Sequence, residues 1–184
     1  MDGSHRKEVM KGALKRRAFV IVDMLEDFVR EGAPLEVPGA RAIVKNIKRE
    51  LERARAEGLP VIYVCDRHLS DDPEFKVWPP HAVEGTAGAE VIDELKPQEG
   101  ERMIFKTTYS GFCHTDMEQI LREMGVEELV ITGVATEICV LFTAADAYMR
   151  GFEVKVLEDC VAGITPEGHR FALQHMKEIL KPRK

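Results

Sequence analysis

The sequence has little of what membrane and nucleic-acid proteins need. No apolar run in its 184 residues approaches the length of a membrane span, and Met1–Arg17 lack the apolar stretch of a secretory signal. Its 26 Lys and Arg residues are outnumbered by 32 Asp and Glu residues, which gives a net charge of −6. A nucleic-acid partner would need a clustered basic face, so this balance argues against one. We therefore expect a cytoplasmic protein that binds neither membrane nor nucleic acid.

Cysteine pairs are also absent. The four cysteines lie far apart and form no C-x-x-C motif, so neither a zinc knuckle nor a thioredoxin-like redox pair is predicted. Without a secretory signal, free reduced thiols are the default. Cys65, Cys113 and Cys160 are expected to pack in the core or near the surface. The fourth, Cys139, differs because it closely follows a strand-like run.

What the chain does have is an alternation of buried strands and helices. Its length fits one domain, residues 1–184, in which residues 1–17 form an N-terminal arm or a first helix. Five apolar runs, most of them without polar alternation, predict strands buried on both faces: Ala18–Met24, Pro60–Asp66, Arg102–Lys106, Glu128–Val134 and Glu153–Leu157. Helical patterns lie between them, at about Ala40–Glu57, Thr115–Met124, Glu137–Met149 and Pro166–Leu180. This alternation predicts the α/β class, a three-layer α/β/α sandwich around a central, mostly parallel sheet.

One long segment, Arg67–Gly88, has several Pro and Gly residues and no clear periodicity. A structureless loop of that length in a compact domain usually carries function or is disordered. This one contains His68, Trp78 and His81, which favours function.

Reactive side chains stand at the predicted carboxyl ends of four strands. Asp23 and Asp66 end the first two, Lys106 ends the third, and Cys139 follows the fourth at the start of a helix, where N–H groups favour a thiolate. Taken singly, Asp23 could cap a helix, Lys106 could lie on the surface, and Cys139 could be a core thiol. Ligands of open parallel sheets, however, bind beyond these strand ends. Together the residues predict catalysis, in which a carboxylate takes the thiol proton, an ammonium group holds the thiolate, and the thiolate attacks an electrophilic carbon.

A second group of residues has the composition of a metal site. Asp66 and His68 are two residues apart at a strand end, so they project to the same side. His81, carried by the long loop, could supply a third ligand and leave open positions, as in catalytic metal sites. A histidine hydrogen-bonded within a loop would explain either His residue alone. The three together predict a divalent metal.

These residues stand in motifs that resemble those of the isochorismatase-like cysteine hydrolase superfamily and, within it, the nicotinamidases. The motifs are Val22-Asp23-Met24-x-x-Asp27-Phe28, Asp66-x-His68, Trp78-Pro79-x-His81, Gly85-Thr86-x-Gly88-Ala89-Glu90, Lys106, Tyr109-Ser110-Gly111-Phe112 and Gly133-Val134-Ala135-Thr136-x-x-Cys139-Val140. The resemblance covers the chain from about Phe19 to Met176. True isochorismatases lack the nucleophilic cysteine, so Cys139 argues for an amide hydrolase.

The resemblance implies a role for each residue of the first group. Cys139 would be the nucleophile, Asp23 the general base and Lys106 the third member of the triad. Backbone N–H groups of Ala135 and Cys139 would form the oxyanion hole, helped by a cis peptide bond between Val134 and Ala135. The implied reaction converts nicotinamide and water to nicotinate and ammonia through a thioester.

The resemblance also implies a cofactor, a pocket and an assembly. The metal, most commonly zinc, would be held by Asp66, His68 and His81, and would hold the pyridine nitrogen of the substrate. An aromatic pocket would be lined by Phe28, Trp78 and Tyr109, although core packing alone would explain Phe28. Members of the family are often homodimers or higher homo-oligomers.

Three departures from the nicotinamidase pattern bear on the substrate. Arg67 stands where Trp is common, Ala82 stands where Cys often follows the last His ligand, and the interval from His68 to His81 is short. The amidase chemistry is unaffected, but another small amide or a ureido or carbamoyl compound becomes a second possible substrate. Hydrolysis by metal-activated water is a rival mechanism for the same residues. A non-catalytic metabolite-binding or thiol redox module on the same fold is a rival function.

Overall fold

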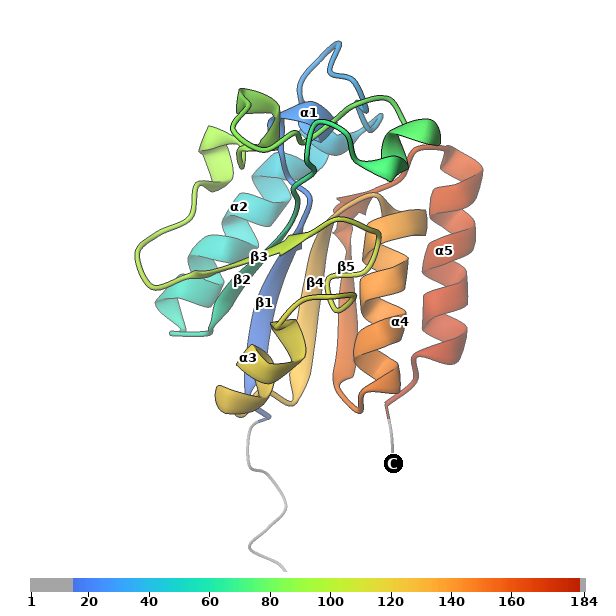
Figure 1. Ribbon diagram of the computed structural model, residues 1–184. Coiled ribbons are helices and arrows are strands. Elements are labelled where there is room, and N and C mark those ends of the chain that lie inside the picture. Colours follow the sequence, from blue (N-terminus) through green and yellow to red (C-terminus); the bar gives the residue numbers. More distant parts are fainter. Residues whose placement is uncertain (1–14, 183–184) are drawn as a thin grey trace, which may run out of the picture.

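The computed structural model describes residues 15–182. Its centre is a five-stranded sheet in which all neighbouring strands are parallel (Figure 1). The strand order is β3-β2-β1-β4-β5. The strands are β1 (Arg17–Val22), β2 (Val61–Asp66), β3 (Arg102–Lys106), β4 (Glu128–Val134) and β5 (Glu153–Ala162).

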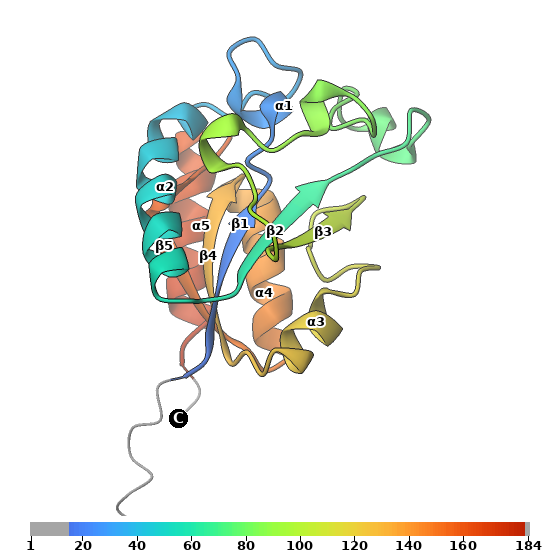
Figure 2. The same cartoon turned by 90° about the vertical axis from the view of Figure 1, so that its left-hand side faces the viewer.

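Helices cover both faces of this sheet (Figure 2). On one face lies α2 (Ala40–Ala56), and on the other lie α3 (Met117–Glu123), α4 (Leu141–Met149) and α5 (Pro166–Ile179). A short helix, α1 (Glu26–Val29), follows β1 beyond the carboxyl ends of the strands. The predicted α/β/α sandwich is therefore confirmed. No helix within residues 15–182 combines the length and the apolar content that crossing a bilayer requires.

The central strands serve two separate cores, because successive side chains of a strand point to opposite faces. In β1, Phe19 and Ile21 pack in the core beneath α2, whereas Val20 and Val22 pack against the helices of the opposite face. None of the four is more than 2% exposed. Burial on both faces explains why such strands show no polar alternation in the sequence.

The N-terminal boundary differs from the prediction. Arg17 already belongs to β1, and the strand ends at Val22 rather than Met24. Asp23 therefore lies just beyond the strand, with a backbone φ of +50°. Residues 1–14, the greater part of the predicted arm or helix, lie outside the described residues.

The segment predicted to be an irregular loop is ordered by short elements. Pro73–Lys76 form a 3₁₀ helix, and His68 pairs with Val83 in a parallel bridge. The N–H of His68 also donates to the carbonyl of Ala82 at 3.0 Å. These contacts bring the two ends of the segment side by side, at the carboxyl edge of the sheet.

β1 and β4 approach so closely at their carboxyl ends that only glycine fits there. A Cβ added at Gly133 would lie 1.9 Å from the carbonyl oxygen of Val22, and Gly133 has a φ of +110°. The order of the strands reverses between β1 and β4, which is where open parallel sheets form their ligand crevice. Asp23 follows β1 and the turn that carries Cys139 follows β4, so both reach this crevice.

Candidate active site

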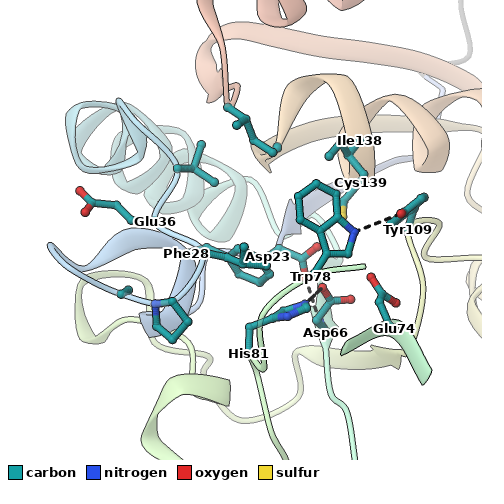
Figure 3. Close-up of a pocket in the computed structure, with 16 residues that line it drawn as sticks. Asp23, Phe28, Glu36, Asp66, Glu74, Trp78, His81, Tyr109, Ile138 and Cys139 are labelled. Atoms are coloured by element: carbon teal, nitrogen blue, oxygen red, sulfur yellow. Dashed lines mark hydrogen bonds and ion pairs between the residues drawn. The ribbon is translucent and has the colours of Figure 1, made fainter. Parts of the chain in front are cut away.

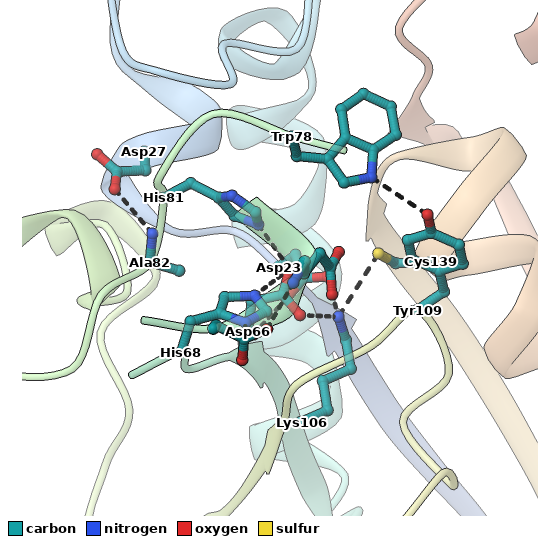
Figure 4. Close-up of polar contacts among 12 residues, drawn as sticks. Asp23, Asp27, Asp66, His68, Trp78, His81, Ala82, Lys106, Tyr109 and Cys139 are labelled. Atoms are coloured by element: carbon teal, nitrogen blue, oxygen red, sulfur yellow. Dashed lines mark hydrogen bonds and ion pairs between the residues drawn. The ribbon is translucent and has the colours of Figure 1, made fainter. Parts of the chain in front are cut away.

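Three side chains from the other strand ends converge on the ammonium group of Lys106 (Figure 4). Its Nζ lies 2.8 Å from Asp23 Oδ2 and 3.5 Å from Cys139 Sγ. The same Nζ donates to Asp66 Oδ1. Asp23 and Lys106 are each 1% exposed. The structure thus brings together the four strand-end residues that the sequence singled out.

Backbone hydrogen bonds hold Asp23 in this arrangement. Its N–H donates to the carbonyl of Val64 in β2 at 2.8 Å, and its Oδ1 accepts the N–H of Asp66 at 2.7 Å. A positive φ is uncommon outside glycine and persists where the surroundings over-determine it. The two bonds provide that constraint, so the carboxylate is fixed beside the end of β2.

Burial and neighbouring charges set the protonation of this group. Burial, reinforced by the charge of Asp66, raises the pKa of Asp23 to about 6 against the pull of Lys106. Burial also raises the pKa of the Cys139 thiol well above its ordinary value, although Lys106 opposes the shift. The pKa of Lys106 is raised despite its burial, because two carboxylates face it. Burial therefore opposes the thiolate form that the N–H groups at the start of a helix were expected to favour.

Cys139 lies in a π-helical turn, Thr136–Val140, which precedes α4 and moves the start of that helix four residues beyond the predicted Glu137. The peptide bond before Ala135 is cis, as the family resemblance implied. The carbonyl of Ala135 accepts the N–H groups of Ile138 and Val140, each at 3.1 Å. These bonds close the turn around the thiol.

The three predicted metal ligands also meet at this edge of the sheet. The Nε2 atoms of His68 and His81 lie 3.8 Å and 3.6 Å from Asp66 Oδ2. Their Nδ1 atoms face elsewhere, that of His68 toward Asp72 Oδ2 at 3.0 Å and that of His81 toward the carbonyl of Pro79 at 2.8 Å. In the neutral tautomer that donates Nδ1–H to these oxygens, each Nε2 would have the free lone pair that a metal ligand needs.

An unpaired atom supports the same interpretation. The Nε2 of His68 is buried and has no hydrogen-bond partner among residues 15–182. Donor atoms of Asp66, His68 and His81 all lie within 4.8 Å of one another. One carboxylate and two imidazoles form a donor set that suits zinc. The residues present therefore fit the divalent metal that the sequence predicted.

Members of both groups line one pocket of about 290 Å³, namely Asp23 and Cys139 of the first and Asp66 and His81 of the second (Figure 3). Phe28, Trp78 and Tyr109, which were predicted to form its aromatic wall, all line it. The indole Nε1 of Trp78 donates to the hydroxyl of Tyr109 at 3.1 Å, which ties two loops together beside the thiol. The lining is completed by Asp23, Asp66, His81, Cys139, Ala33, Pro34, Leu35, Glu36, Val37, Glu74, Ala135, Ile138 and Ile164.

Sequence reasoning missed four acidic residues around the site. Glu36 and Glu74 line the pocket, and Asp72 holds the first histidine of the metal group. The carboxylate of Asp27 accepts the N–H of Ala82 at 2.9 Å and so holds the loop just after the second histidine. Asp27 stands in one of the motifs and could have been found. The other three lie in segments without periodicity, where the sequence carries no signal for them.

Comparison with known proteins agrees with this geometry. The family model for the isochorismatase domain matches residues 17–182. An uncharacterized isochorismatase family protein, PncA of Bacillus subtilis, is 37% identical in an alignment that covers 87% of this chain and 93% of that protein. The nicotinamidase/pyrazinamidase of Mycobacterium tuberculosis is 34% identical over 88% of this chain and 94% of its own. The ureidoacrylate amidohydrolase RutB of Agrobacterium fabrum is 32% identical over 82% of this chain and 77% of its own.

Solved structures lead to the same family. An isochorismatase-like hydrolase from Alkaliphilus metalliredigens has a TM-score of 0.87 at 38% identity and covers 90% of this chain and 93% of its own. The pyrazinamidase of Pyrococcus horikoshii in complex with zinc has a TM-score of 0.84 at 37% identity, over 89% of this chain and 95% of its own. Because the family model spans nearly all of the described residues and these relatives align over most of their length, the chain belongs to the isochorismatase family, as a nicotinamidase-like hydrolase.

Proposed function

We propose that this protein hydrolyses small, planar, uncharged primary amides with Cys139 as the nucleophile, and that nicotinamide is the leading substrate. The observation that carries the proposal is the Lys106 ammonium group, which contacts both the Asp23 carboxylate and the Cys139 thiol. Asp23 and Cys139 line the pocket, so both can reach a bound amide. A nucleophile, a base and a cation in mutual contact are what amide cleavage through a thioester requires.

Each residue of this triad has its own task in the proposed reaction. Asp23 takes the thiol proton as the sulfur of Cys139 attacks the carbonyl carbon, and Lys106 stabilises the thiolate. The C–N bond then breaks, and Asp23 returns the proton to the leaving nitrogen, which departs as ammonia. Water, deprotonated by the same carboxylate, attacks the thioester and releases the carboxylic acid and the free thiol.

The negative oxygen of the tetrahedral intermediate needs donors close to the sulfur. The N–H groups of Ala135 and Cys139 are proposed for this task. Both residues line the pocket, so a carbonyl carbon beside the sulfur also lies beside this turn. Loss of one such donor typically lowers the rate by about 10²–10³-fold.

The charges of the pocket wall favour an uncharged substrate. Glu36 and Glu74 contribute carboxylates, and none of the described residues that line the pocket is Lys or Arg. The guanidinium of Arg67 stacks on Phe105, 3.4 Å from the ring centre, and does not line the pocket. A substrate with its own carboxylate, such as ureidoacrylate, would meet like charges there, which disfavours its binding. Hydrolysis of a ureido or carbamoyl compound on the same triad is therefore the second candidate.

Rates of hydrolysis of several amides test this ranking of uncharged amides above anionic ureido compounds. We expect the purified protein, supplied with zinc, to release ammonia from nicotinamide with a kcat/KM at least about tenfold above that for ureidoacrylate, because like charges disfavour the anionic substrate. Glu74→Gln should narrow this difference, because it should raise kcat/KM for the anionic substrate, ureidoacrylate. Glu84→Gln is the matched control, since this side chain of the same segment is 56% exposed and outside the pocket lining. Faster hydrolysis of ureidoacrylate by the unmodified protein would favour the second candidate.

A metal would be held by Asp66, His68 and His81. When bound, it would supply a Lewis-acid anchor for a ring nitrogen of the substrate. The zinc complex of the Pyrococcus pyrazinamidase supports zinc as the metal. In this proposal the triad carries out the bond changes, and the three ligands serve to orient the substrate.

Removal of one ligand tests the metal assignment. His81→Ala is expected to lower zinc affinity by at least about 10–100-fold, the loss that even an outer-shell partner of a ligand causes. Zinc content by mass spectrometry after dialysis measures this directly. The KM for nicotinamide should rise more than kcat falls, because the anchor acts on binding. His175→Ala is the control, since that ring stacks on Phe171 of α5 and does not line the pocket. Unchanged zinc content in His81→Ala would show that the ligand set is wrong.

A further inference from the structure

Glu137 joins the turn that carries Cys139 to the start of α5. Its Oε1 accepts the N–H of Ile164 at 2.8 Å and the N–H of Thr165 at 3.1 Å. These two residues immediately precede α5, and Ile164 also lines the pocket. One carboxylate thus links the nucleophile turn to the wall of the pocket.

The space around this carboxylate is shaped by two glycines. A Cβ added at Gly163 would lie 2.4 Å from Glu137 Oε2, and one added at Gly168 would lie 2.8 Å from Oε1. A side chain at either position would therefore displace the carboxylate. The close fit shows that Glu137 is confined to this position.

Capping of α5 does not account for this arrangement. The helix has its own cap, because Thr165 Oγ1 accepts the N–H of Gly168 at 3.0 Å and Pro166 occupies the first helical position. A surface pair, Glu167 with Arg170, adds a second carboxylate to the same helix start. Glu137 comes instead from a different element and binds the two N–H groups just outside the helix.

A neighbouring residue of the turn is tied to the same helix. Thr136 Oγ1 and His169 Nδ1 lie 2.8 Å apart in a hydrogen bond. Thr136 and Glu137 are the first two residues of the π-helical turn, and Cys139 follows two residues later. Both contacts anchor the turn to α5 and to the two residues that precede it.

We infer that Glu137 is a positioning residue that fixes the turn, so that the sulfur of Cys139 and the proposed oxyanion donors stay aligned with Asp23 and Lys106. The inference rests on the proposed role of Cys139 as the nucleophile. Misplacing a reacting group by about 1 Å can cost about 10²-fold in rate. Loss of the hydrogen bonds that Glu137 accepts should therefore lower the rate of the chemical steps while leaving substrate binding nearly intact.

Amide turnover by the full-length Glu137→Ala variant is the first readout. We expect kcat to fall about 10–100-fold and KM to change less than about threefold, because alignment acts in the transition state. Glu137→Gln keeps an oxygen that can accept both N–H groups, so it should recover most of the loss. Glu167→Ala, on the exposed start of α5, is the matched control and should behave like the unmodified protein.

The rate of alkylation of Cys139 by iodoacetamide is the second readout, followed by peptide mass spectrometry. It should fall at least about tenfold in Glu137→Ala, because the sulfur leaves the ammonium and carboxylate that activate it. Cys113 serves as the internal reference thiol, since it does not line the pocket. This readout requires no amide turnover, so it decides the inference even if the protein hydrolyses none of the amides tested.

Two results would overturn the inference. One is an alkylation rate of Cys139 that is unchanged or increased in Glu137→Ala. The other is a fall in activity that matches only a smaller folded fraction, with kcat per folded molecule unchanged. If the Ala variant does not fold, Glu137→Asp replaces it, because the shorter side chain keeps the charge but withdraws the oxygen. Glu137→Asp should also lower both kcat and the alkylation rate of Cys139. Values equal to those of the unmodified protein would contradict the inference.

Discussion

Replacement of Cys139 by Ala is expected to lower ammonia release from nicotinamide by about 10⁴-fold or more, as removal of the nucleophile does in catalytic groups that act as a unit. The variant should remain folded, because Lys106 keeps its contacts with Asp23 and Asp66. Steady-state ammonia release and the melting temperature, measured on the same preparation, test both halves of this expectation.

Cys113→Ala is the matched control for this experiment. Cys113 is a free, partly buried thiol that does not line the pocket, so its loss should leave turnover and melting temperature close to those of the unmodified protein. Acid quenching during turnover adds a direct observation of the intermediate. The acyl group should be found on the peptide that contains Cys139 and not on the one that contains Cys113.

The same variant separates the thioester mechanism from its rivals. Hydrolysis by metal-activated water would survive Cys139→Ala and be abolished by a chelator. A thiol redox module would need a resolving thiol, and no C-x-x-C motif supplies one for Cys139. Retained amide turnover in Cys139→Ala would end the case for a nucleophilic cysteine.

The strand-end residues could be found from the sequence for a physical reason. Strands buried on both faces form apolar runs that are easily recognised, and all strands of a parallel sheet end at one edge. Asp23, Asp66 and Cys139 each end or follow such a run, whereas Lys106 ends β3, a partly exposed edge strand. Their contacts in the structure follow from that shared edge.

What the sequence could not reveal depends on contacts between distant segments. The long loop is ordered by the Asp27 carboxylate, which binds the N–H of Ala82, and by the bridge between His68 and Val83. No local pattern encodes either contact. The burial that raises the pKa of Cys139 is hidden for a similar reason, since it depends on how deeply the folded chain buries the turn.

Replacement of Lys106 by Met is expected to remove both activity and much of the stability. Asp23 and Asp66 would be left buried without the ammonium group that now contacts both. Removing one partner of a buried ion pair costs about 3–5 kcal/mol. For a domain of this size, such a loss lowers the melting temperature by roughly 6–20 °C. Calorimetry measures this shift, and ammonia release measures the activity.

The double variant Asp23→Asn/Lys106→Met tests the cause of the destabilisation. Asn removes one of the two carboxylates that lose the ammonium group, so the melting temperature should recover in part. Turnover should not recover, because the proposed base and the cation beside the thiol are both missing.

Lys155→Met, on the exposed surface of β5, should change neither the melting temperature nor the turnover. A Lys106→Met variant that melts like the unmodified protein would contradict the assignment of Lys106 as the counter-ion of both carboxylates. Recovery of stability in the double variant would show that the ammonium group of Lys106 offsets buried charge. Its role in catalysis is measured instead by kcat per folded molecule in Lys106→Met, which keeps Asp23.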